Sequence, residues 1–139
     1  MRQWQSEIVI ATAGRGLYEM TVAARQFVRD SGIGLGQLTF FIRHTSASLL
    51  IQEAADPNVG CDLQEFFSRL VPEETPWFRH REEGPDDMPS HIKSALTQTS
   101  LTVPVASGDL ALGTWQGVYL FEHRSAPHRR RVLLHLIGE

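Results

Sequence analysis

The segment from Arg43 to Ser48 places an imidazole beside three hydroxyl groups, directly after a strongly apolar stretch. His44 is followed by Thr45, Ser46 and Ser48. A buried hydroxyl needs a hydrogen-bond partner, and a strand does not require three of them together. Because these groups donate hydrogen bonds to oxyanions, the segment predicts binding of a phosphate or a similar group. The alternative is a polar strand end whose side chains bond their own backbone.

Two further histidines, His80 and His91, lie in an acidic segment and in the short helix expected after it. Three histidines from separate elements can converge on a divalent metal and leave one position open for water or substrate. With His44 they form the predicted metal site, although their spacing matches no compact metal motif. Asp86 and Asp87 precede the helix, where they can support a ligand or cap the helix, and capping is the role we expect.

A carboxylate and an aromatic side chain extend the candidate site. Glu53 follows the strand that carries Ser48, where it can act as general base or metal ligand, or lie exposed at the strand end. Trp115 offers a stacking face and Gln116 offers both a donor and an acceptor, which together suit a heteroaromatic ring. The alternative for Trp115 is a role in the core or in an interface.

Composition and charge exclude several classes of function. The net charge is −3, which gives no general attraction to nucleic acid. The longest apolar runs, such as residues 38–42, are far too short to cross a bilayer, and residues 1–7 lack the pattern of a signal peptide. One cysteine, Cys61, excludes an internal disulfide framework and suits a reducing compartment. We therefore expect a cytoplasmic protein with no nucleic-acid or membrane partner.

The charges are unevenly distributed along the chain. They form either two solvated patches or the two sides of a contact between subunits, and the basic block can also hold an anionic ligand. The acidic block contains Glu73, Glu74, Glu82, Glu83, Asp86 and Asp87, and the basic block contains Arg124, Arg129, Arg130 and Arg131.

The elements that must position these residues indicate one α+β domain over residues 1–139, with antiparallel strands. A long polar loop is expected over residues 73–87. Strands are predicted over residues 5–12, 37–42, 47–51, 101–105, 110–112, 116–123 and 131–137, and helices over 20–30, 57–71 and 89–96.

Several local predictions follow from these elements. Asp56 is expected to cap the second helix, with Pro57 at its first position. Ile92, Ala95 and Leu96 are expected to face inward from the third helix. The strand over residues 116–123 carries bulky apolar groups on both faces, which indicates a central strand. Pro104 favours an edge strand or bulge, and Cys61 is expected to be buried and inert.

Four separated motifs, in this order, resemble the YjbQ-like family, which is often labelled secondary thiamine-phosphate synthase. The resemblance extends over nearly the whole chain. The motifs are His-Thr-Ser-Ala-Ser-Leu at residues 44–49, Glu-Ala-Ala-Asp-Pro at 53–57, Gly-Pro-Asp-Asp-Met-Pro-Ser-His-Ile-Lys at 84–93, and Leu-Gly-Thr-Trp-Gln-Gly at 112–117 with Glu-His-Arg at 122–124.

The resemblance implies an antiparallel β-sandwich or barrel-like core with about three helices, a homotrimer, and a divalent metal, zinc or magnesium. It also implies a weak activity that joins a thiazole phosphate to an aminopyrimidine pyrophosphate. Ala54 stands where the family usually has Asn, which removes an amide donor. Carried onto this chain, the site has His44, His80 and His91 as metal ligands, His44, Glu53 and Asp87 as catalytic residues, and Thr45, Ser46, Ser48, Lys93, Trp115 and Gln116 as substrate-binding residues.

Three hypotheses remain open at this point. The first is an enzyme whose metal-associated site handles a phosphorylated small molecule, and we favour it. The second is a non-enzymatic oligomer that binds a metal or a phosphorylated metabolite. The third is a structural module in which the histidines only satisfy buried hydrogen bonds.

Overall fold

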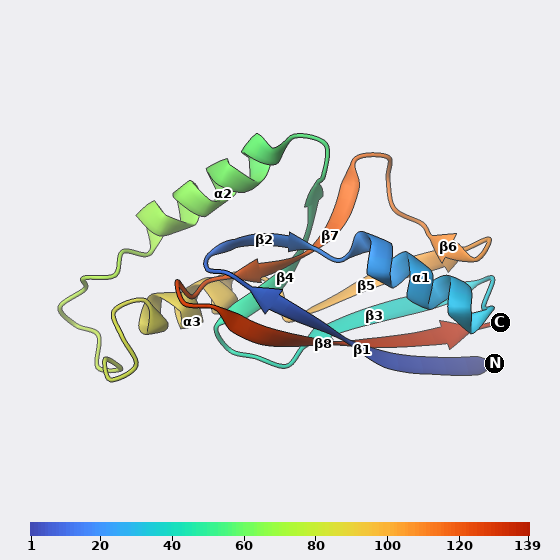
Figure 1. Ribbon diagram of the computed structural model, residues 1–139, viewed down its shortest axis with the longest axis horizontal. Coiled ribbons are helices and arrows are strands. Elements are labelled where there is room, and N and C mark those ends of the chain that lie inside the picture. The colour runs from blue at the N-terminus through green and yellow to red at the C-terminus, as the bar shows by residue number, and fades with distance from the viewer.

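The computed structural model describes all 139 residues, and it consists of two antiparallel sheets curled into a half-barrel with three helices (Figure 1). The larger sheet has the strand order β1-β8-β3-β5-β6 and the smaller has β2-β7-β4. The α+β class and the antiparallel core are therefore confirmed. The elements are β1 (Arg2–Thr12), β2 (Gly16–Glu19), α1 (Thr21–Ser31), β3 (Gly36–Ile42), β4 (Ala47–Glu53), α2 (Pro57–Leu70), α3 (Asp87–Leu96), β5 (Ser100–Ala106), β6 (Asp109–Leu110), β7 (Gln116–Glu122) and β8 (His128–Gly138).

The core lies between the two sheets and follows the two-residue period of the strands. In β3, Leu38, Phe40 and Ile42 are buried, whereas Phe41 points to the other face and is exposed. One cluster of 18 buried apolar residues joins both sheets and α1. Because successive strand residues point to opposite faces, this alternation fixes which side chains of every strand enter the core.

The expected strands and helices are all present, with shifted ends. The strand β2 is an addition, because residues 14–16 predict a turn and only residues 17–19 remain before the helix expected from residue 20. It pairs with β7 over Gly16–Glu19. The prediction that β7 is central is confirmed, since β2 and β4 flank it. Along most of its length β5 is an edge strand, as Pro104 indicates, because β6 pairs with its last two residues only.

The helix α3 buries the opposite side to the one expected. Ala95 and Leu96 are exposed and Ile92 is half-buried, so the prediction that these three face inward is wrong. The buried side chains are Asp87, Pro89, Ser90, Lys93 and Ser94. The helix packs against β4 at the polar end of the small sheet, where Ser94 Oγ donates to the Ala47 carbonyl. Hydrogen-bonding partners at that end, rather than apolar surface, decide which side is covered.

The helix α2 is capped as expected but covers little of the molecule. Asp56 Oδ1 accepts a hydrogen bond from the Asn58 backbone N–H at 2.9 Å, and Pro57 occupies the first turn. No residue of α2 is buried. Cys61 is therefore exposed, which overturns the prediction of a buried thiol. The ring of Phe67 contacts Phe121 of β7 edge to face, and this contact holds α2 against the sheet.

The two ends of the half-barrel differ in character. Both chain termini, α1 and β6 lie at one end, whereas α3 and the loop after α2 lie at the other (Figure 1). No helix of the structure has the length and apolar character needed to span a membrane.

A close approach of β3 and β8 gives the first prediction. Gly36 and Gly138 are paired, and a Cβ on Gly36 would lie 2.3 Å from the Ile137 carbonyl oxygen. Gly36→Ala must therefore separate two core strands, and we expect it to lower the free energy of unfolding by about 3 kcal/mol. Urea denaturation measures the change. Gly34→Ala is the control, because its Cβ would meet Glu139 O at an ordinary 3.7 Å. Equal stability of the two variants would contradict the assignment.

Candidate metal centre

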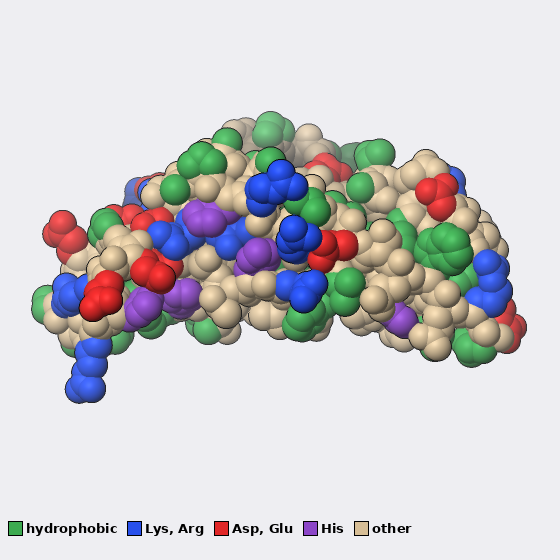
Figure 2. All heavy atoms as spheres, turned by 60° about the horizontal axis from the view of Figure 1, so that its bottom comes forward, with side chains coloured by type: hydrophobic (Ala, Val, Ile, Leu, Met, Phe, Trp, Pro, Cys, Tyr) green, Lys and Arg blue, Asp and Glu red, His purple; other side chains and the backbone are tan.

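Four potential metal ligands meet where the loop after α2 joins α3. His80 and Glu83 come from the loop, and Asp87 and His91 lie one turn apart on α3. One ligand atom from each lies within 4.8 Å of all the others. Histidine, basic and acidic side chains gather over this half of the face in Figure 2, whereas the other half is mostly uncharged. The cluster can hold a metal ion.

The hydrogen bonds of His91 orient it as a metal ligand. Its Nδ1 lies 2.8 Å from the Thr45 carbonyl oxygen, which can only accept, so Nδ1 carries a proton. In the neutral ring, Nε2 then presents a lone pair, and it faces Asp87 Oδ2 at 3.0 Å. Either a second proton on the ring, which then donates to Asp87, or a metal ion between the two atoms accounts for this contact. A histidine that donates its other N–H to a backbone carbonyl is the usual arrangement at metal sites.

His80 directs its Nε2 at the same carboxylate oxygen. It lies 2.6 Å from Asp87 Oδ2 and 3.4 Å from Glu83 Oε2. The hydrogen bond to Asp87 raises the pKa of His80. Ligands of a tetrahedral zinc ion lie ~3.3 Å apart, given Zn–N and Zn–O distances of about 2 Å. A zinc ion in place of the shared proton would therefore separate His80 Nε2 and Asp87 Oδ2 slightly.

Arg124 holds Asp87 in place from the other side. Its guanidinium donates to Asp87 Oδ1 at 2.7 Å, which leaves Oδ2 directed at the two histidines. Burial opposes ionisation of Asp87, but the hydrogen bond from His80 and the positive charges of His91 and Arg124 outweigh it and lower its pKa. Asp87 is thus an ionised, nearly inaccessible carboxylate with one oxygen free for a cation.

Asp86 anchors the start of α3 without capping it. It occupies the cap position, but its side chain makes no capping hydrogen bond, so the expected role is wrong. Its Oδ2 instead accepts from the Arg124 Nε and from the Ser125 backbone N–H. Burial opposes ionisation, and these bonds outweigh it and lower the pKa of Asp86 to about 2. Arg124 also donates to the Glu83 carbonyl, so the loop is tied to the end of β7.

A buried ion pair lies beneath this arrangement. Glu122 of β7 and Arg130 of β8 both point into the space between the sheets and are almost inaccessible. The Arg130 Nε donates to Glu122 Oε1 at 2.8 Å, and Thr12 Oγ1 donates to the same oxygen at 2.6 Å. Glu122 Oε2 accepts from the backbone N–H groups of His123 and Arg124. Every charge is thus paired, which is the condition for burying it.

His44 lies outside the four-residue cluster. Its Nε2 accepts a hydrogen bond from the Arg131 backbone N–H at 2.8 Å, so this nitrogen is occupied by β8. Burial, followed by the charge of Arg130, lowers its pKa and favours the neutral ring. The structure therefore brings His80, His91 and Asp87 together and leaves His44 outside the group.

The three hydroxyl residues after His44 have separate surroundings. Thr45 contributes its carbonyl to His91, and its side chain is exposed. Ser46 Oγ accepts from Arg130 at 3.0 Å. Ser48 is completely buried, and its Oγ lies 2.9 Å from His123 Nε2.

Glu53, Trp115 and Gln116 lie at the opposite end of β4 and β7. Ala47 pairs with Glu122 at one end of these strands, and Glu53 pairs with Gln116 at the other. Six residues of strand separate the two ends by ~20 Å. Within one chain, Trp115 and Glu53 therefore do not share a site with the metal cluster. Glu53 instead borders a separate cavity of about 490 Å³ under α2.

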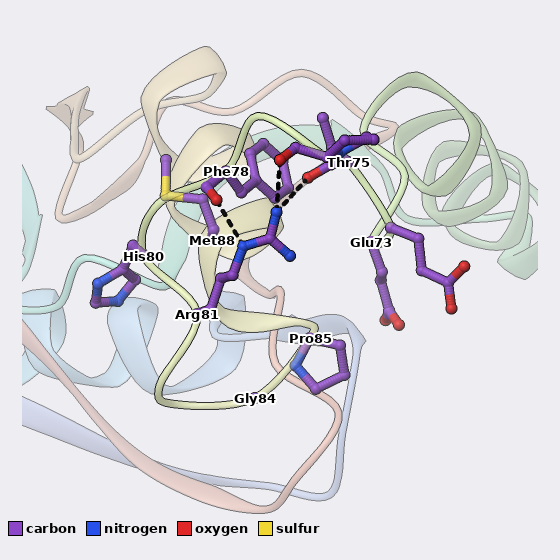
Figure 3. A pocket seen from close by; sticks show the side chains of 10 residues that line it. Glu73, Thr75, Phe78, His80, Arg81, Gly84, Pro85 and Met88 are labelled. Carbon is purple, nitrogen blue, oxygen red and sulfur yellow. Dashed lines mark hydrogen bonds between the residues drawn. The ribbon is translucent and has the colours of Figure 1, made fainter.

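A cavity of about 530 Å³ adjoins the metal cluster through His80. Phe78, Pro85 and Met88 contribute apolar side chains to its lining. Arg81 lies between His80 and Glu73 in Figure 3 and donates hydrogen bonds to three backbone carbonyls of the loop, including Phe78 O at 2.6 Å. These bonds give the loop a fixed shape, so the cavity is a preformed space for a small molecule.

Sequence reasoning placed Glu83, Arg124 and Arg130 only in the two charge blocks, and it gave no role to His123. Glu83 stands three residues after His80, and Asp87 stands four before His91, which is the spacing of neighbours on a helix. Placing the start of the helix at Asp87 would have identified that pair. Glu122 shares a strand face with Val118 and Leu120, and a charged residue in that register signals a buried partner.

The buried ion pair gives the second prediction. Burial opposes ionisation of Glu122, but Arg130 and Thr12 lower its pKa below the ordinary 4.5. Glu122→Gln would leave Arg130 buried without its counter-charge, and we expect a loss of about 3 kcal/mol in the free energy of unfolding at pH 7. Because the pKa of Glu122 is lower in the folded protein than in the unfolded chain, the ion pair stabilises the fold fully above about pH 5. This stabilisation is lost as the pH falls through the pKa that Glu122 has in the folded protein. The difference between the two proteins should therefore shrink in acid.

Glu7→Gln is the matched control for that measurement. Glu7 pairs with Arg131 and Arg43 on the surface, where ion pairs contribute little to stability. Chemical denaturation at pH 7 and pH 4 compares both variants with the unchanged protein. An equal, small effect of the two substitutions would show that the buried pair does not hold the sheets together.

Comparisons with known proteins agree over the full length of the chain. The family model described as "UPF0047 protein YjbQ-like" matches residues 6–139. A UPF0047 protein of Synechocystis is 54% identical over 138 residues, covering 99% of this chain and 94% of that protein. YjbQ of Escherichia coli is 40% identical over 98% of this chain and 99% of its own length.

Solved structures share the fold. A conserved hypothetical protein of Thermus thermophilus matches with a TM-score of 0.85 and 32% identity, over 95% of this chain and 99% of that one. A protein of unknown function from Sulfolobus solfataricus has a TM-score of 0.90 at 22% identity, over 99% of both chains. The chain therefore belongs to the YjbQ-like UPF0047 family, as its motifs, the full-length match and the shared fold together indicate.

Proposed function

We propose that this protein is a metal-dependent enzyme acting on a phosphorylated small molecule. The observation that carries the proposal is the convergence of His80 Nε2 and His91 Nε2 on Asp87 Oδ2, where a metal ion can replace the protons that bridge these atoms. Two imidazole nitrogens with carboxylate oxygens favour zinc, since magnesium prefers oxygen ligands alone. His80, Asp87 and His91 would hold the ion, and Glu83 or a substrate oxygen would take the fourth position.

The reaction we assign is of the thiamine-phosphate-synthase type. A bound divalent ion would neutralise the pyrophosphate that leaves the aminopyrimidine when the thiazole phosphate is joined to it. The cavity beside His80 supports a substrate of this size, and its apolar side chains can pack on a heteroaromatic ring. Arg124 positions Asp87, and the Thr45 carbonyl positions His91, so the ligand atoms are oriented before the ion binds.

Metal binding is the third prediction. The metal-free protein is titrated with zinc against a chromophoric chelator. We expect one ion per chain, and we expect His91→Gln to weaken binding at least about 100-fold, because it removes a ligand nitrogen. His44→Gln is the control and should change the affinity little, since its Nε2 is bonded to β8. Equal losses in both variants would place His44 among the ligands, and no binding by the unchanged protein would exclude the metal centre.

Turnover is the fourth prediction. With the thiazole phosphate and the aminopyrimidine pyrophosphate, the zinc-loaded protein should release pyrophosphate and form thiamine phosphate slowly, and His91→Gln should abolish both. Chromatography with fluorescence detection of the oxidised product measures the rate. Stoichiometric metal without turnover above a blank would instead support a binding protein that sequesters the metal or a phosphorylated metabolite.

We also propose that the chain forms a homotrimer. Large apolar side chains on and after α2 support an association of copies, because Phe66, Leu70 and Trp77 each expose more than half of their surface. Light scattering coupled to size-exclusion chromatography measures the mass directly. A monomer at micromolar concentration would reject this assembly.

A further inference from the structure

Lys93 is the only lysine of the chain, against twelve arginines. It lies on α3, only two residues after His91, and only 2% of its surface is exposed. Side chains two residues apart leave a helix in nearly opposite directions, about 200° around its axis. Lys93 therefore points away from the metal cluster. Its neighbour Ser94 donates to the carbonyl of Ala47, the residue before Ser48. A lysine buried to this degree ordinarily has a charged partner.

The other inward-facing cations near this end of the molecule all have carboxylate partners. Arg124 pairs with Asp86 and Asp87, and Arg130 pairs with Glu122. Lys93 forms no salt bridge, and its ammonium donates no hydrogen bond, although its surroundings include the charges of Arg15, Glu73 and Asp86. The ammonium nitrogen has no partner but is not fully enclosed, so it still contacts solvent. The fold thus holds one buried cation without an anion.

His123 supplies a second unmatched group beside it. Its Nδ1 is the single fully buried side-chain nitrogen or oxygen without a hydrogen-bond partner. Its Nε2 lies 2.9 Å from Ser48 Oγ, and the ring packs on Phe121 with centroids 4.4 Å apart. When the serine hydroxyl donates to Nε2, Nδ1 carries the proton and is an unused donor. Burial, followed by the charge of the nearby Lys93, lowers the pKa of His123 to about 3.

We propose that Lys93 and His123, with Ser48 fixing the ring, form a binding site for a small phosphate-type oxyanion. The ammonium supplies the charge, and the Nδ1–H donates to one oxygen of the anion. One anion that accepts hydrogen bonds from both groups would explain why the buried Nδ1 of His123 and the ammonium of Lys93 have no partner in the protein. Of the expected phosphate-binding residues His44, Ser46 and Ser48, this site retains Ser48 alone. It goes beyond the metal centre, because Lys93 and His91 leave α3 in nearly opposite directions.

The test uses the fact that a single lysine gives a single signal. In protein labelled with carbon-13 and nitrogen-15 lysine only, the Lys93 Cε–Hε resonance is followed during titration with inorganic phosphate at pH 7. Sodium chloride of equal ionic strength is the reference. We expect a saturable shift with phosphate and with sulfate, and none with chloride. A shift that is absent, or that chloride reproduces, overturns the site.

Two serine variants locate the anion. Ser48→Ala leaves the His123 ring without its hydroxyl partner, and we expect it to weaken phosphate binding roughly tenfold. Ser46→Ala should leave the midpoint unchanged, since Ser46 Oγ is bonded to Arg130. The reverse pattern would place the anion beside Arg130 and refute the proposal. His91→Gln should still bind phosphate, so loss of the metal centre and loss of the anion site are told apart.

Discussion

The buried ion pair between Glu122 and Arg130 is the constraint on which the polar end of this molecule depends. It occurs where β7 leaves the small sheet and the chain returns as β8 in the large one. Glu122 also accepts from the backbone of His123 and Arg124, so the pair sets the direction of the connection that follows.

Through Arg124, the ion pair also positions the residues of the candidate metal centre. With its backbone held by Glu122, Arg124 reaches Asp86 and Asp87 at the start of α3 and the carbonyl of Glu83 in the loop. One arginine therefore fixes the helix that carries His91 and the loop that carries Glu83. One oxygen of Asp87 is hydrogen-bonded to a guanidinium, and the other is directed at two imidazoles. This is the arrangement that the proposed metal centre requires.

The helix α3 carries residues of both proposed binding sites. An amphipathic helix normally buries its apolar side, because apolar burial supplies most of its stability. This helix exposes Leu96 and buries Lys93, an arrangement that binding requires and that folding alone would disfavour. His91 faces the metal cluster on one side, and Lys93 faces His123 on the other. The apolar contact area thereby lost must be supplied elsewhere, and the continuous core of the two sheets supplies it.

The sequence by itself determined the fold class, nearly all of the strands and helices, the cap at Asp56 and the family, because these depend on local periodicity, local hydrogen bonds and uninterrupted motifs. It also indicated His80, His91 and Asp87 as members of one site.

Only the tertiary structure decided that His44 bonds to β8, that Trp115 lies at the far end of the same strands, and that Ser46 and Ser48 have different partners. It also revealed Arg124 and the unpaired Lys93. These are relations between residues far apart in the chain, and they follow from strand register and sheet order, which periodicity does not specify. A residue's type sets the chemistry that it can perform, but the register of the strands sets which other groups it meets.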